Sequence, residues 1–149
     1  MAHHLQRPVM KHIFVCVAAA LLLWGCSQAP EAPVAATLQT LEAGRQVYTA
    51  NCAACHQADG NGVPNMQPAL VDDPVVQGDT TQLIRVVLQG PAAVLPEDRP
   101  HYSNMMPPFS RLSDQQIADL LTYLRHDFGH QASPVGVDQV QTIRAQFGS

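Results

Sequence analysis

The chain has 149 residues, of which 46% are hydrophobic and 13% are charged, and its formal net charge at pH 7 is −4. This length allows one domain of ordinary size. The chain holds 8 basic residues against 12 acidic ones, with no basic stripe, which argues against a nucleic-acid partner.

Residues 1–25 are predicted to be a signal peptide of the lipoprotein type. An apolar run over residues 13–23 follows Arg7 and Lys11, and it is too short to span a membrane. The run ends in Leu23-Trp24-Gly25-Cys26, which resembles the box where bacterial lipoproteins are cut before a lipid-modified cysteine. We therefore expect the chain on the periplasmic side of a bacterial membrane, held by a lipid anchor on Cys26. An uncleaved anchor and a Sec signal with a different cleavage site are the alternatives.

Residues 26–39 are predicted to be a flexible tether, and residues 40–149 the folded domain. The tether sequence is rich in Ala and Pro and lacks periodicity. Removal of residues 1–25 leaves six arginines, no lysine and 12 acidic residues, a net charge of −6 with His neutral. The folded domain is therefore acidic.

The first helix of the domain is expected over residues 41–51, with Thr40 as a candidate N-cap. Leu41, Gly44 and Tyr48 fall on one face of this helix. A glycine inside a helix costs about 1 kcal/mol relative to alanine. We therefore expect Gly44 to serve the close approach of another helix.

Three further helices are expected, separated by a turn-rich segment over residues 57–79 and a proline-rich loop up to residue 109. The second helix covers residues 81–89, is capped by Asp79 or Thr80, and stops at Gly90-Pro91. The third begins at the capping box of residues 113–116 and ends at Gly129, and the fourth covers residues 138–147. The third helix has one apolar stripe, formed by Ile117, Leu120, Leu121, Leu124 and Phe128. The fourth is expected to turn Val140, Ile143 and Phe147 inward. No segment has the period of a strand, so the predicted fold is all-α.

The sequence Cys52-Ala53-Ala54-Cys55-His56 is the C-x-x-C-H signature of c-type haem attachment. The two thiols form thioethers with one porphyrin, and the histidine becomes the proximal iron ligand. A structural zinc site would need a second pair of ligands, and no second C-x-x-C exists in the chain. A thioredoxin-type redox pair would need a βαβ context, whereas the flanking segments are predicted to be helical.

A second axial ligand has several candidates in the sequence. They are Met66, Met105, Met106, His101, His126 and His130. Met106 directly precedes Pro107 in the proline-rich loop, and Met105 is its close rival. A bis-histidine centre through His101 is a further alternative.

At this point the chain resembles the class I c-type cytochromes, in particular the small bacterial domains that are also fused to dehydrogenases and oxidases. The resemblance covers residues 40–130 and rests on Gly44, Tyr48, the pentad 52–56, Pro68-Ala69-Leu70, Met106-Pro107, and residues 113–125 with Tyr123. It implies a cytochrome c-like fold, with short helices packed around one covalent haem c. Because the expected apolar core is thin, the haem would supply part of it.

The resemblance also assigns roles to single residues. It implies His56 and Met106 as the axial ligands, and the Pro68 carbonyl as the acceptor for the second ring nitrogen of His56. It implies that Leu70 packs on the porphyrin. Two candidates for the haem propionates are Tyr102 and Arg85. The chain departs from the family in lacking a tryptophan near the propionates and in having no lysine after residue 25.

Two protein ligands would leave iron without an open position, which favours one-electron transfer over catalysis. The sequence thus predicts a membrane-tethered carrier, or the cytochrome subunit of a dehydrogenase or oxidase, that exchanges electrons with partner proteins. A haem enzyme or gas sensor with a labile sixth ligand is one alternative. A structural lipoprotein that never receives haem is the other.

Overall fold

A computed structural model describes residues 36–129 and 131–147, and the regular secondary structure in these ranges is helical, with loops between the helices. The helices are α2 (Leu38–Asn51), α3 (Ala53–His56), α4 (Pro74–Gln77), α5 (Thr80–Gln89), the 3-10 helix η2 (Pro91–Ala93), α6 (Asp114–Asp127) and α7 (Val137–Ala145). Extended pairing in the described residues amounts to one isolated bridge between Val63 and Gln67. The all-α prediction is confirmed for this part of the chain. No helix in the described ranges has both the length and the apolar character that crossing a membrane requires.

Several expectations lie outside the described residues. They are the signal peptide of residues 1–25, the lipid anchor at Cys26, the tether as far as residue 35, and His130, one of the candidates for the second axial ligand.

The first helix begins three residues earlier than expected. Its N-cap is Thr37, whose Oγ1 accepts a hydrogen bond from the Thr40 backbone N–H at 3.1 Å. Thr40 is therefore inside the helix, and residues 38–39 do not belong to a tether. The sequence analysis missed the first turn of α2 because that turn is exposed to solvent. Leu38 leaves 87% of its surface in contact with solvent, so no apolar periodicity marks this turn.

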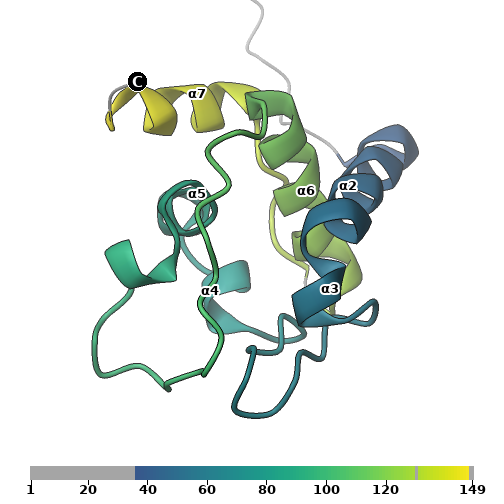
Figure 1. The fold of residues 1–149 in the computed structure, drawn as a ribbon. Coiled ribbons are helices and arrows are strands. Elements are labelled where there is room, and N and C mark those ends of the chain that lie inside the picture. Colours follow the sequence, from purple (N-terminus) through teal and green to yellow (C-terminus); the bar gives the residue numbers. More distant parts are fainter. Residues whose placement is uncertain (1–35, 130, 148–149) are drawn as a thin grey trace, which may run out of the picture. The chain divides into compact units, whose positions relative to one another are not determined.

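Helices α2 and α6 lie side by side on the right of Figure 1, and they approach each other closely at Gly44. A β-carbon on Gly44 would lie 2.1 Å from the Asp119 carbonyl oxygen and 2.6 Å from Tyr123 Cβ. The expected close approach is confirmed. Below this crossing, the rings of Tyr48, Tyr123 and Phe128 pack in a cluster, with centroids 5.2–5.8 Å apart.

Capping residues define the N-terminal ends of helices α5 and α6. The Asp79 carboxylate accepts from the Gln82 N–H, so α5 starts one residue before the expected position. Ser113 and Gln116 form the expected capping box of α6, and Gly129 follows its end with a φ of 79°. Helix α7 ends at Ala145, so Phe147 lies beyond it and is 37% exposed rather than turned inward. The Phe147 ring lies against the Arg85 guanidinium of α5.

The short helices were not expected. Helices α4 and η2 each begin at a proline and lie within segments predicted as loops. Helix α4 is capped by Asp73, whose Oδ1 accepts from the Val75 and Val76 N–H groups. These pieces are a single turn long, too short to show helical periodicity in a sequence.

Arg125 links α6 to neighbouring segments through three side-chain hydrogen bonds. Its side chain is buried, and it donates to the carbonyl oxygens of Val76 at 2.7 Å, Gly78 at 3.1 Å and Ser133 at 2.7 Å. Burial lowers the pKa of Arg125, and the charge of Asp79 opposes that shift. This guanidinium thus connects α4, α6 and the segment before α7.

Candidate functional site

The pentad lies at the end of α2 and folds into one tight turn. The Cys52 N–H donates to the Tyr48 carbonyl oxygen at 2.8 Å, and the Cys52 carbonyl oxygen accepts from Cys55 at 3.0 Å and His56 at 2.9 Å. Helix α3 is this turn. Both thiols are free; Cys55 is exposed and Cys52 is half-buried. The turn therefore presents two thiols and an imidazole from one short stretch of backbone.

His56 is oriented by a backbone carbonyl twelve residues further along the chain. Its Nδ1 lies 3.0 Å from the Pro68 carbonyl oxygen, the contact implied by the resemblance. Burial lowers the pKa of His56, while the Pro68 hydrogen bond and the charge of Asp73 act in the opposite direction. A neutral ring that donates from Nδ1 keeps the lone pair of Nε2 for a metal ion.

Gly62 leaves room for the Pro68 carbonyl, although the sequence analysis placed this glycine only within the turn-rich segment 57–79. Gly62 has a φ of +62°, and a β-carbon on it would lie 2.4 Å from the Pro68 carbonyl oxygen. Its N–H donates to the His56 carbonyl oxygen at 2.9 Å. The backbones of Val63 and Gln67 pair beside it, at 2.9 and 3.1 Å. The loop is therefore closed tightly around the histidine.

Burial also affects the first thiol. It raises the pKa of Cys52 to about 11, and the neighbouring Cys55 contributes in the same direction. Cys52 is therefore a protonated thiol at neutral pH. Within residues 36–129 and 131–147, no group of three or more His, Cys, Asp and Glu side chains is arranged to hold a metal ion. An iron ion at His56 would thus need a cofactor that brings most of its ligands, and a porphyrin does so.

The two adjacent methionines of the loop before α6 differ in their exposure to solvent. Met106 is half-buried and packs against the core, whereas Met105 is 86% exposed. The Met106 carbonyl is close to Gly90, where a β-carbon would lie 3.2 Å from it. Three residues later, the buried Phe109 donates its N–H to the Val87 carbonyl oxygen at 2.8 Å. The backbone around Met106 is thus fixed against the end of α5.

Two hydrogen bonds join this loop to the loop that follows the pentad. The Ser103 N–H donates to the Asn65 carbonyl oxygen at 2.9 Å, and the Asn104 N–H donates to the Met66 carbonyl oxygen at 3.2 Å. Segments that start more than 35 residues apart therefore meet beside the site. In Figure 1 the loop after the pentad lies below the helices, and the loop before α6 begins at that same end, away from α7, before it runs upward to the start of α6.

The other residues predicted to contact the haem lie in different environments. Leu70 is half-buried against the core, and its N–H donates to the Gly60 carbonyl oxygen at 2.7 Å. Tyr102 is 37% exposed on the loop that meets Asn65. The Arg85 guanidinium lies 5.1 Å from the centre of the Phe147 ring, and thus faces the chain end after α7. Of the other ligand candidates, Met66, His101 and His126 are exposed.

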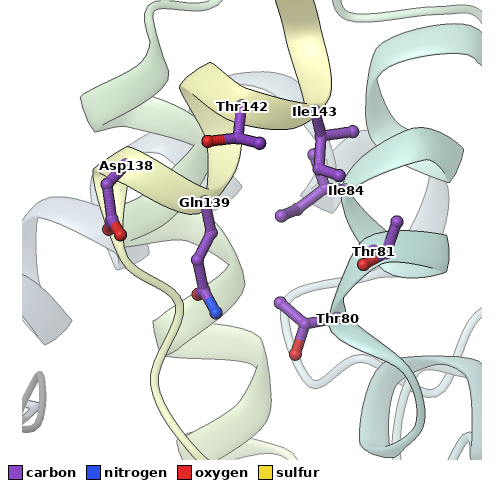
Figure 2. Close-up of a pocket in the computed structure, with 7 residues that line it drawn as sticks. All are labelled: Thr80, Thr81, Ile84, Asp138, Gln139, Thr142 and Ile143. Atoms are coloured by element: carbon purple, nitrogen blue, oxygen red, sulfur yellow. The ribbon is translucent and has the colours of Figure 1, made fainter. Parts of the chain in front are cut away.

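A shallow groove between α5 and α7 shares no residue with the predicted haem site. Figure 2 shows Thr80, Thr81 and Ile84 of α5 on one side and residues of α7 on the other. Asp138, Gln139, Thr142 and Ile143 complete its lining. None of these residues was assigned to haem binding by the sequence analysis.

Comparison with known proteins is consistent with this geometry. The sequence model of the cytochrome c family matches residues 41–127. The chain is 41% identical, over 68% of its length, to the cytochrome c subunit of a quinone alcohol dehydrogenase from Gluconobacter oxydans, and covers 22% of that subunit. It is 36% identical, over 69% of its length, to the gluconate 2-dehydrogenase cytochrome c subunit of Pantoea cypripedii, and covers 24% of it.

A smaller relative matches over most of its own length. Cytochrome c-552 of Thermus thermophilus is 29% identical over 69% of this chain and 85% of the relative. The chain spans about a quarter or less of each of the two dehydrogenase subunits named above, 22% and 24%. The helical fold, the pentad and the family match agree, and the chain belongs to the cytochrome c family, with one covalently bound haem c as its cofactor.

Proposed function

We propose that this chain is a one-electron carrier whose haem is attached through Cys52 and Cys55 and ligated by His56 and Met106. The observation that carries this proposal is the contact between His56 Nδ1 and the Pro68 carbonyl oxygen, at 3.0 Å. It leaves Nε2 as the metal-binding nitrogen of a buried, neutral imidazole. The haem supplies reversible one-electron chemistry at its iron.

The protein's contribution is to fix two ligands of different character. The Pro68 carbonyl makes the imidazole of His56 a stronger donor. The sulfur of Met106 is a soft, weak donor that favours the ferrous state and raises the reduction potential. Its half-buried position on a fixed loop supports Met106 over the exposed Met105. Leu70 would supply apolar contact to the porphyrin, and Tyr102 is the candidate for its propionates, whereas the guanidinium of Arg85, the other sequence-based candidate, lies against the Phe147 ring.

Two axial ligands from the protein leave no position for a substrate, so we propose electron transfer rather than catalysis. The names of the two dehydrogenase relatives support a role beside a dehydrogenase, as a free carrier or as its cytochrome component. Both relatives are far longer than this chain. A haem enzyme or gas sensor would instead require Met106 to leave the iron.

The function can be tested on the purified protein. Haem should remain on the chain in a denaturing gel, and the protein should take up and release one electron reversibly in a potentiometric titration. The ferrous form should not bind carbon monoxide at neutral pH. A chain without covalent haem would contradict the proposal, and rapid carbon monoxide binding would favour the gas-sensing alternative.

We further propose that the chain is exported and tethered to the membrane. Residues 1–25 would be removed, Cys26 would carry lipid, and the tether would end before α2 begins at Leu38. The support is the Leu23-Trp24-Gly25-Cys26 sequence, together with the extracytoplasmic site of haem attachment in the family resembled. Cys26→Ser should give a soluble haem protein or an uncleaved precursor. Mass spectrometry that found an N-terminus elsewhere, without acyl chains, would disprove the anchor.

A further inference from the structure

Helix α7 is joined to the loop before α6 by the side chain of Arg144. Its Nε donates to Asp114 Oδ1 at 2.6 Å, and its two Nη groups donate to the carbonyl oxygens of Ser110 at 2.8 Å and Leu112 at 2.7 Å. The side chains of Arg144 and Asp114 are 31% and 27% exposed. In Figure 1 the start of α6 accordingly lies beside α7. One guanidinium thus uses its three nitrogens on three acceptors that are partly shielded from water.

The two carbonyl groups belong to the turn that follows Met106, formed by residues 109–112. The Leu112 N–H donates to the Phe109 carbonyl oxygen at 3.0 Å, and the Phe109 N–H donates to the Val87 carbonyl oxygen of α5 at 2.8 Å. Helix α5 therefore holds the first residue of the turn, and Arg144 holds its second half.

Two prolines connect Met106 to this turn. The rings of Pro107 and Pro108 fix φ at about −65°, and a residue before a proline is confined to extended conformations. Few backbone bonds between Met106 and Phe109 are thus free to rotate. On the other side of Met106, the Asn104 N–H is bonded to the Met66 carbonyl oxygen. A displacement of the Met106 backbone would therefore be transmitted to the turn.

Arg144 comes from a part of the chain that lies beyond the match to the cytochrome c family. That match ends at residue 127, whereas α7 covers Val137–Ala145. Val140 and Ile143 anchor α7, since both are buried in the core. The helix that carries Arg144 is thus fixed to the domain independently of the contacts that Arg144 makes.

We propose that Arg144 is a positioning residue for the axial methionine, and that it keeps the Met106 sulfur on the haem iron by holding the turn 109–112. The inference rests on the proposed ligation by Met106. A hydrogen bond from a charged donor stabilises more than a neutral one, and without the guanidinium two carbonyl groups of the turn would lose such a donor. The population of molecules in which this loop has moved away from the iron would then increase.

Imidazole measures that population, because it can bind the iron only where Met106 has left it. Its apparent affinity is proportional to the fraction of molecules in the open state. The experiment titrates the ferric, haem-loaded protein with imidazole and measures the urea midpoint of each variant alongside. The variants are Arg144→Met and Arg144→Lys. The matched control is Val140→Ala, because Val140 is fully buried and lies about one turn before Arg144 on the same helix.

We expect Arg144→Met to lower the imidazole concentration at half conversion about tenfold or more, the effect of losing one charge-assisted hydrogen bond. Val140→Ala should lower the urea midpoint through the cavity it leaves, yet change the imidazole affinity less than about threefold, because opening of the loop is a local event. Arg144→Lys keeps a charge beside Asp114 but has a single nitrogen for three acceptors. It should fall between the wild type and Arg144→Met, and it serves as the test if Arg144→Met does not fold.

Equal imidazole affinities for the Arg144 variants and Val140→Ala would overturn the proposal, since rotation of the Met106 side chain alone would then release the sulfur. That result would leave ligation by Met106 intact in a wild type that shows the far-red band of methionine-bound ferric haem. A wild type without this band would contradict both the ligation and the role of Arg144.

Discussion

Gly62 lies directly against the carbonyl group of Pro68, with room for no side chain between them. A β-carbon on Gly62 would lie 2.4 Å from the Pro68 oxygen, the same oxygen that is 3.0 Å from His56 Nδ1. The glycine thus sets the position of the group that orients the proposed iron ligand. A side chain at residue 62 would have to displace it.

Gly62→Ala should therefore raise the reduction potential of the haem-loaded protein. Loss of a hydrogen bond of about 1 kcal/mol to the ferric state corresponds to a shift of about 40 mV for one electron. The control is Gly60→Ala, since Gly60 also has a positive φ, of 73°, but its β-carbon would meet the Phe128 ring. Spectroelectrochemical titration of both variants measures the difference. The same potential in both would mean that Gly62 has no influence on His56.

The double variant Cys52→Ala with Cys55→Ala should lose covalent haem and most of its helical structure. The reason is that the thiols hold the cofactor, and the porphyrin would add apolar mass to a thin core. Far-ultraviolet circular dichroism and a haem stain provide the readouts. Native helicity in a haem-free double variant would show that the fold does not depend on the cofactor.

Arg125→Met should lower the stability of the protein by about 2–4 kcal/mol, because three carbonyl groups lose a buried donor. Arg45→Met is the comparison, since the Arg45 side chain is 54% exposed and pairs only with Glu42 on its own helix. That variant should unfold at nearly the same urea concentration as the wild type. If both variants unfolded together, the Arg125 contacts would not be stabilising.

Gly44→Ala should separate α2 from α6, because its β-carbon would stand 2.1 Å from the Asp119 carbonyl oxygen. Overpacking of this kind should cost at least about 2 kcal/mol in urea unfolding. Thr49→Ala on the exposed side of α2 should change stability by less than about 0.5 kcal/mol. A Gly44 variant as stable as the Thr49 variant would contradict the close helix contact.

The sequence predicted those parts of the fold that rest on local chemistry. The Ser113 capping box, the Asp79 cap and the apolar stripe of α6 were all identified because each depends on residues three or four apart. The start of α2 was misplaced because its first turn is exposed. The role of Gly62 could not be predicted, since it depends on the position of a carbonyl group six residues away that only the folded loop defines.

The weak far-red charge-transfer band of the ferric protein tests most directly whether Met106 ligates the haem iron together with His56. This band requires a methionine sulfur on ferric haem. We expect the band in the wild type and in Met105→Leu, and we expect Met106→Leu to lose it. A band that survived in Met106→Leu and vanished in Met105→Leu would shift the ligand by one residue, and a wild type without the band would contradict methionine ligation altogether.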